Sequence, residues 1–184
     1  MPETAATLAA GARLPRVVAG VRKGRLLAFD EAAAVWEGWD TETGERVLLR
    51  TGAPGPGLRW REAGGAFVSE PVECALSDFL PLDDPPEETW VAAVLGGALA
   101  ALVAGAAGPA VPDAIVRVRG RWTLAGWGIA PGEPLRDLGE LVAGLDAGPV
   151  GERARSLAEE PPPALADAER LLRADLAARL AEAH

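Results

Sequence analysis

The chain has 184 residues, of which 49% are hydrophobic and 24% are charged. This is the composition of a folded protein that forms one medium domain or two small lobes. A single cysteine, Cys74, excludes an internal disulfide and a cysteine metal cluster. The single histidine, His184, is the last residue, which argues against a histidine-based triad and against an ordinary zinc site.

The net charge of −9 arises in the middle of the chain, because no lysine or arginine occurs between Arg61 and Arg117. A phosphate backbone would be repelled by this stretch, so we expect no nucleic acid partner. The stretch holds nine acidic residues, equal in number to the whole net charge: Glu62, Glu70, Glu73, Asp78, Asp83, Asp84, Glu87, Glu88 and Asp113.

This acidic stretch is either a solvated surface or a docking face for a protein partner with a basic surface. The second interpretation selects Asp83, Asp84, Glu87 and Glu88 as possible partner-binding residues, because they flank a pair of prolines. Their spacing matches no calcium loop, so we expect no metal site there.

Residues 1–16 are expected to be an N-terminal lead-in. They lack a basic segment before an apolar core, so we predict no signal peptide and expect a cytoplasmic location. Residues 17–51 contain four short apolar runs between turn residues, which predict strands. The sequence DTETG, residues 40–44, predicts a hairpin turn between the last two runs, and the sequence TGAPGPG, residues 51–57, predicts a loop.

The proline-rich residues 81–86 predict a boundary between a strand-rich lobe, residues 17–82, and a helical lobe, residues 83–184. A helix is predicted near residues 88–104. The uncharged residues 90–111 are long enough to span a membrane, but most are alanine and glycine, which favours a buried central helix over a membrane span.

Further along, the runs IVRV and RWTL on either side of Arg119 and Gly120 predict a hairpin. Apolar spacing predicts a helix over residues 135–145, and a final helix follows the prolines near residue 163. In that last helix, Glu169–Arg173 and Asp175–Arg179 are predicted ion pairs at i, i+4. The six tryptophans either fill the core or form a partner-binding patch.

Two blocks of the sequence resemble bacterial Ser/Thr protein kinases. Residues 26–50 (LLAFDEAAAVWEGWDTETGERVLLR) resemble the glycine-rich loop and the strand that ends in the ATP-contacting lysine. Residues 111–130 (VPDAIVRVRGRWTLAGWGIA) resemble the catalytic loop and the metal-binding DFG turn. The resemblance covers roughly residues 17–146 and implies a strand-rich lobe followed by a helical lobe.

In both blocks the residues that carry catalysis in the family are replaced. Residues 29–35 contain no glycine and place two carboxylates where phosphates would come. Arg50 stands where the family has lysine, and arginine is not a substitute for the compact ammonium. Glu62 resembles the helix glutamate that pairs with that lysine, so an Arg50–Glu62 ion pair would be structural.

The second block is altered in the same way. Ala114 stands for the metal-binding asparagine, and Gly126-Trp127-Gly128 stands for the DFG turn, so Mg²⁺ cannot be held in the usual manner. Only six residues, 131–136, remain where a kinase carries its activation segment.

We therefore predict an α+β protein with a compact two-lobed, protein kinase-like fold, with a strand-rich N-lobe and a shortened helical C-lobe. The resemblance implies a catalytically inactive pseudokinase without a cofactor, acting as a bacterial protein-binding or regulatory module. One alternative is a membrane-anchored regulator that uses residues 90–111 as a span. Another is a small enzyme of unrelated chemistry, although no residue cluster with catalytic spacing supports it.

Overall fold

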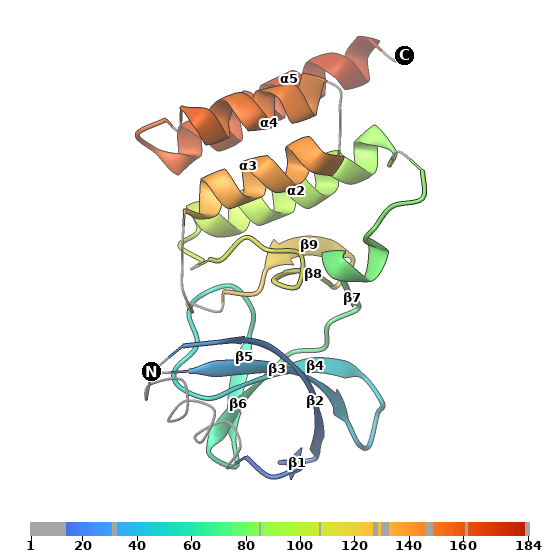
Figure 1. Cartoon of the computed structure of the whole chain (residues 1–184), viewed down its shortest axis with the longest axis vertical. Helices are drawn as coiled ribbons and strands as arrows, with labels where there is room; N and C mark the ends of the chain where they lie inside the picture. Colours follow the sequence, from blue (N-terminus) through green and yellow to red (C-terminus); the bar gives the residue numbers. More distant parts are fainter. Residues whose placement is uncertain are drawn as a thin grey trace.

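The computed structural model describes residues 14–30, 33–84, 86–106, 108–126, 129, 133–145, 149–160 and 162–182. Its architecture is mixed α+β, and at that level the predicted class is confirmed. Figure 1 shows a six-stranded sheet at one end of the molecule and the α-helices at the other, with a three-stranded sheet between them.

The six-stranded sheet is antiparallel, with the strand order β1-β2-β3-β4-β6-β5. The strands predicted at residues 33–39 and 46–50 are confirmed as β3 and β4. The run at residues 17–21 instead contains the turn between β1 and β2, and the run at residues 25–29 is the second half of β2. The hairpin turn at residues 40–44 is confirmed, and Asp40 Oδ1 accepts hydrogen bonds from two backbone amides of that turn. The six strands are β1 Val17–Val18, β2 Val21–Phe29, β3 Ala34–Asp40, β4 Arg46–Arg50, β5 Trp60–Ala63 and β6 Ala66–Ser69.

Successive side chains of a strand point to opposite faces, so this curled sheet contributes to two cores. Val35 and Leu48 pack on the side of the helices, in the main core of the molecule. The other face packs against itself, and its buried residues are Val18, Val21, Ala34, Trp36, Val47, Leu49, Ala66 and Val68.

The smaller sheet has the order β7-β8-β9, formed by β7 Cys74–Ala75, β8 Ile115–Val118 and β9 Arg121–Leu124. The hairpin predicted around Arg119 and Gly120 is confirmed, and both residues have the positive φ of a tight hairpin turn. β7 runs directly into a short 3-10 helix, η1 Leu76–Phe79. β7 therefore precedes the predicted boundary near residue 82 and yet pairs with β8, which follows it.

The central helix is α2 Glu88–Val103, which confirms the helix predicted near residues 88–104. Because α2 is apolar around most of its circumference, it is buried on most sides. Its fully buried residues, each at most 4% exposed, are Val91, Val94, Leu95, Ala98, Leu99 and Leu102. No helix in the described ranges is long and apolar enough to cross a membrane.

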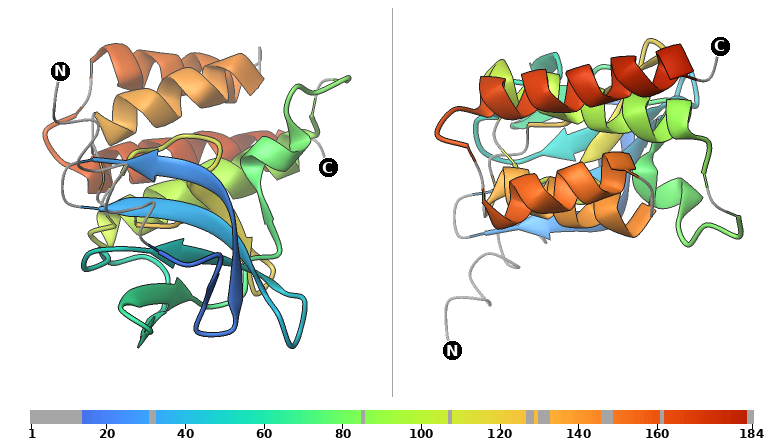
Figure 2. Two further views of the ribbon diagram at one scale, coloured as in Figure 1. Left: turned by 60° about the horizontal axis from the view of Figure 1, so that its bottom comes forward. Right: turned by 90° about the horizontal axis from the view of Figure 1, so that it is seen from above.

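Three more helices complete the fold: α3 Pro134–Leu145, α4 Pro149–Glu159 and α5 Leu165–Glu182. Figure 2 shows α3 beside α4 and α2 beside α5. The sequence predicted α3 and α5 but not α4, whose apolar face is narrow. α4 instead approaches α3 at Gly139, where an added Cβ would lie 2.6 Å from the carbonyl oxygen of Ala154.

The ion pairs predicted on the last helix had different outcomes. Arg173 Nε donates to Glu169 Oε1 at 2.7 Å, as predicted. Asp175 pairs with Arg153 of α4, so this carboxylate links α4 to α5 instead of forming a pair within α5. The side chain of Arg179 lies outside the described residues.

β9 is an edge strand whose outer carbonyl groups are covered by other parts of the chain. The hydrogen bond from Ala125 N to Ala114 O shows which residues of the β8–β9 pair form backbone hydrogen bonds to each other. Because paired and unpaired residues alternate in an antiparallel ladder, the carbonyls of Trp122 and Leu124 point away from β8.

Two glycines allow this close covering. At Gly97 of α2, an added Cβ would lie 2.1 Å from the Trp122 carbonyl oxygen. At Gly57, an added Cβ would lie 2.7 Å from the Leu124 carbonyl oxygen. The helix and the loop after β4 therefore lie with their backbones directly on the free edge of β9.

Candidate functional site

Arg50, the residue in place of the kinase lysine, is buried at the end of β4 and is only 5% exposed. Its Nε donates to the carbonyl oxygen of Gly52 at 3.3 Å. Its Nη1 is buried and has no hydrogen-bond partner among the described residues. Burial lowers the pKa of Arg50 from its ordinary value, and nearby Asp30 partly opposes this effect.

Glu62 lies on strand β5, so the prediction that it resembles a helix glutamate is wrong in its secondary structure. Gly64 and Gly65 form the turn of a β5–β6 hairpin, which leaves no helix between β4 and β6. Both Arg50 and Glu62 lie opposite Phe67, on either side of β6. Two strand spacings, about 9.6 Å, thus separate their backbones, and the described residues show no Arg50–Glu62 ion pair.

The segment compared above with a glycine-rich loop forms the turn between β2 and β3. Asp30 Oδ1 accepts a hydrogen bond from Ala33 N at 2.8 Å, and Thr51 Oγ1 accepts one from Ala34 N at 2.9 Å. Phosphate binding by such a turn depends on free backbone N–H groups. Two of these groups are already bound to side chains of the protein.

Gly126, the first residue of the segment in place of the DFG turn, has φ +68°. An added Cβ at this position would lie 1.9 Å from the carbonyl oxygen of Pro56. A side chain is therefore excluded at Gly126 both by the backbone conformation and by the loop after β4. Trp127 and Gly128 lie outside the described residues.

Ala114, in place of the metal-binding asparagine, is buried with 1% exposure. The preceding Asp113 accepts hydrogen bonds from Arg25 Nη2 at 2.8 Å and from Ser77 Oγ at 2.6 Å. Burial raises the pKa of the Asp113 carboxyl, but the hydrogen bonds from Arg25 and Ser77, together with the charges of Arg25 and Arg46, leave the pKa below its ordinary value. Asp113 thus joins β2, η1 and the segment before β8.

The predicted partner-binding residues lie near the start of α2. Asp83, Asp84 and Glu87 are exposed, and none of their carboxylates has a hydrogen-bond or ion-pair partner within the described ranges. Glu88 is the first residue of α2, and its side chain lies outside the described residues. Three carboxylates with no charge to balance them give this surface a negative potential.

An aromatic cluster follows this acidic segment at the start of α2. Phe79 of η1, Trp90 of α2 and Trp122 of β9 contact one another edge to face, with ring centroids 5.7 to 6.1 Å apart. Trp122 is 8% exposed, whereas Phe79 is 43% exposed. The cluster therefore has a buried end, at Trp122, in the core and an exposed ring, that of Phe79, at the surface.

Sequence reasoning did not find Arg25, Ser77 or Phe79. The Arg25–Asp113 pair spans 88 positions, so no local pattern signals it. Phe79 was visible only as an apolar residue within an acidic stretch. No group of three metal-binding side chains occurs in the part of the chain that the structure describes.

Comparison with known proteins adds no family to this description. The chain matches no model of a known protein family and no curated protein.

Proposed function

We propose that this chain is a catalytically inactive, protein kinase-like module that works by binding another protein. The order of its elements supports the proposal: a strand-rich sheet, a long buried helix, a short hairpin and a further helix follow one another along the chain. The two blocks that resemble kinase motifs lie on β2–β4 and on β8–β9.

The observation that carries the inactive part of the proposal is the covering of Gly126 by Pro56. A kinase needs an aspartate side chain in this turn to hold Mg²⁺. Here the residue is a glycine with positive φ, and the loop after β4 takes up the space of any side chain. Two amides of the β2–β3 turn are already bound to Asp30 and Thr51, and Arg50 is buried. Both observations also support an inactive site.

Nucleotide binding tests this part. We expect that ATP with Mg²⁺ leaves the melting temperature of the protein unchanged, because Gly126 has no side chain to hold the metal and two amides of the β2–β3 turn are already bound within the protein. Binding at a hundred times the dissociation constant would stabilise the fold by about 2.7 kcal/mol, which a melting experiment detects easily. A Mg²⁺-dependent rise of several degrees would overturn the proposal.

The binding part of the proposal rests on the acidic surface at residues 83–87 together with exposed Phe79. Interfaces are enriched in aromatic residues, and an uncompensated charge favours a partner of opposite sign. The partner is therefore a protein with a basic surface and an apolar side chain that contacts Phe79 and Trp90.

Charge reversal tests the binding part. Asp83, Asp84 and Glu87 would be changed together to lysine, and Glu152, Glu159 and Glu160 would be changed in a control with the same shift in charge. We expect the wild type and the control to capture the same proteins of the native host, and we expect salt to release them. The first variant should fail to capture them. Equal capture by both variants would show that the acidic segment is only a solvated surface.

A further inference from the structure

The exposed side of α2 forms the floor of a groove of about 690 Å³ between β9 and α5. This groove lies on the one side of the helix that the core does not cover. Its lining residues are Thr89, Ala92, Ala93, Gly96, Gly97, Ala100, Ala101, Gly120, Arg121, Trp122, Thr123 and Arg173.

Apart from Thr89 at one end, the α2 residues that form the floor of the groove are all alanine or glycine. Neighbouring glycines play different parts: Gly97 lies against the Trp122 carbonyl, whereas an added Cβ at Gly96 would meet nothing within 4 Å. Packing inside the protein therefore requires Gly97 but not Gly96. Since glycine weakens a helix relative to alanine, Gly96 keeps the groove deep at some cost in helix stability.

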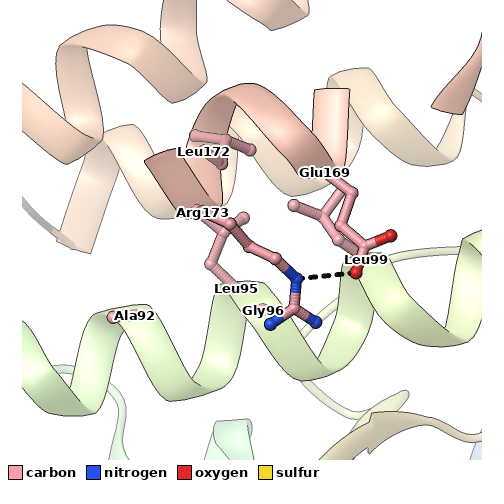
Figure 3. A pocket seen from close by; sticks show the side chains of 7 residues that line it. All are labelled: Ala92, Leu95, Gly96, Leu99, Glu169, Leu172 and Arg173. Carbon is pink, nitrogen blue, oxygen red and sulfur yellow. Dashed lines mark hydrogen bonds and ion pairs between the residues drawn. The ribbon is translucent and has the colours of Figure 1, made fainter. Parts of the chain in front are cut away.

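A side recess of about 50 Å³ opens from the groove between α2 and α5 (Figure 3). Leu95 and Leu99 of α2 and Leu172 of α5 line it. The Glu169–Arg173 ion pair lies over the recess on the α5 side. The recess is thus apolar inside and polar at its rim, which suits a small aliphatic side chain.

The charges of the α2 groove differ in sign from those of the whole protein. Arg121 and Arg173 are the charged residues of its lining, in a chain with a net charge of −9. Arg173 is bound to Glu169 through Nε, whereas Arg121 is exposed and has no partner within the described residues. The groove therefore favours a partner that brings carboxylates to Arg121.

The shape of the groove favours a helix over an extended strand. Its floor, from Thr89 to Ala101, is about 18 Å long, which corresponds to roughly 12 residues of helix. The small residues at positions 92–93, 96–97 and 100–101 recur every four residues, a row into which the ridge of another helix fits. Strand addition to β9 is blocked at Trp122, whose carbonyl is covered by Gly97.

We propose that the α2 groove binds an amphipathic helix of another protein, about three turns long, with a small aliphatic face flanked by acidic residues. The groove begins at Thr89, next to the acidic segment at residues 83–87. Its arginines select an acidic partner segment, whereas the acidic segment would bind a basic one. The inference goes beyond the proposed function and does not depend on the nucleotide site.

Two synthetic helical peptides test the proposal. Both have leucine and alanine along one face; one is flanked by glutamate and the other by lysine. The wild type is expected to bind the glutamate peptide about tenfold more tightly than the lysine peptide, measured by fluorescence anisotropy. Arg121→Glu, a change at an exposed position, is expected to remove this preference.

A matched pair of variants locates the binding site. Gly96→Phe fills the groove and is expected to abolish binding, whereas Gly144→Phe on α3, where a Cβ also meets nothing within 4 Å, is expected to leave it unchanged. Circular dichroism checks that both variants fold. The proposal is overturned if the glutamate peptide does not bind at about 100 μM, if the lysine peptide binds as tightly, or if folded Gly96→Phe binds like the wild type.

Discussion

The edge of β9 and the exposed side of α2 are neighbouring regions in which glycine has opposite effects. At the edge, Gly57, Gly97 and Gly126 allow one part of the backbone to lie directly on another, and the surface is closed. On α2, Gly96 faces empty space, and the surface stays open. The effect of a glycine on packing in this fold therefore depends on which atoms lie beside it.

The strongest test of this difference compares the two sides of α2 itself. Leu99 is 1% exposed, so Leu99→Asp would place an unpaired charge in the core. We expect a loss of more than about 4 kcal/mol, seen as insoluble or unfolded protein. Ala93→Asp on the open side should change the melting temperature little. A folded Leu99→Asp protein would mean that α2 is not the buried central helix.

Gly126→Asp restores the type of residue that a kinase has at this position. We expect the variant to lose about 3 kcal/mol in urea unfolding, because the positive φ and the Pro56 carbonyl both oppose a side chain. The variant should gain no affinity for ATP with Mg²⁺. If it is as stable as the wild type, the loop after β4 does not close this position.

The adjacent glycines of α2 should respond to alanine with opposite signs. Gly97→Ala should destabilise the protein by about 2 kcal/mol, because its Cβ would clash with the Trp122 carbonyl. Gly96→Ala should stabilise it by about 0.5–1 kcal/mol, the ordinary helix preference for alanine. Chemical denaturation of the two variants measures both values, and a shared sign would contradict the difference between closed and open sides.

The smallest expected effect concerns Asp113→Asn at the link to Arg25. Since Arg25 is more than half exposed, solvent screening limits the loss at neutral pH to about 0.5–1 kcal/mol. The pKa of Asp113 is lowered in the folded protein, so its contribution is present above the unfolded pKa of about 3.9 and is lost as pH falls through the folded pKa.

The difference in stability between wild type and Asp113→Asn should therefore stay nearly constant from pH 7 to about 5 and shrink as the pH falls from about 4 to about 2. Urea unfolding at a series of pH values measures it. A difference that stays constant over this range would show that the Asp113 carboxylate has no preferred interaction in the fold.

Local patterns predicted most of the elements but not the contacts between them. Apolar runs identified β3, β4 and the β8–β9 hairpin, because each has a pattern that is visible within a few positions. Glu62, which the resemblance compares with a helix glutamate, lies on β5, since the Gly64-Gly65 turn makes a hairpin there. α4 was missed because its contact with α3 depends on small residues rather than on a wide apolar face.

The candidate site was predictable in its residue types and not in its geometry. The residue types at Arg50, Ala114 and Gly126, and their difference from the kinase motifs that the two blocks resemble, are visible in the sequence alone. That Pro56 covers Gly126 is not, because 70 positions separate the two residues. The same holds for Phe79, whose exposure depends on where η1 meets Trp90 and Trp122.

The covered edge of β9 also bears on how this protein can aggregate. A strand edge with free carbonyl groups is a template for pairing with another chain, above all in a partly unfolded molecule. Opening of the loop after β4 frees the Leu124 carbonyl, but Trp122 stays under α2. Edge-to-edge association of two copies through β9 therefore requires the central helix to detach as well, and transient loop opening alone leaves the protein protected.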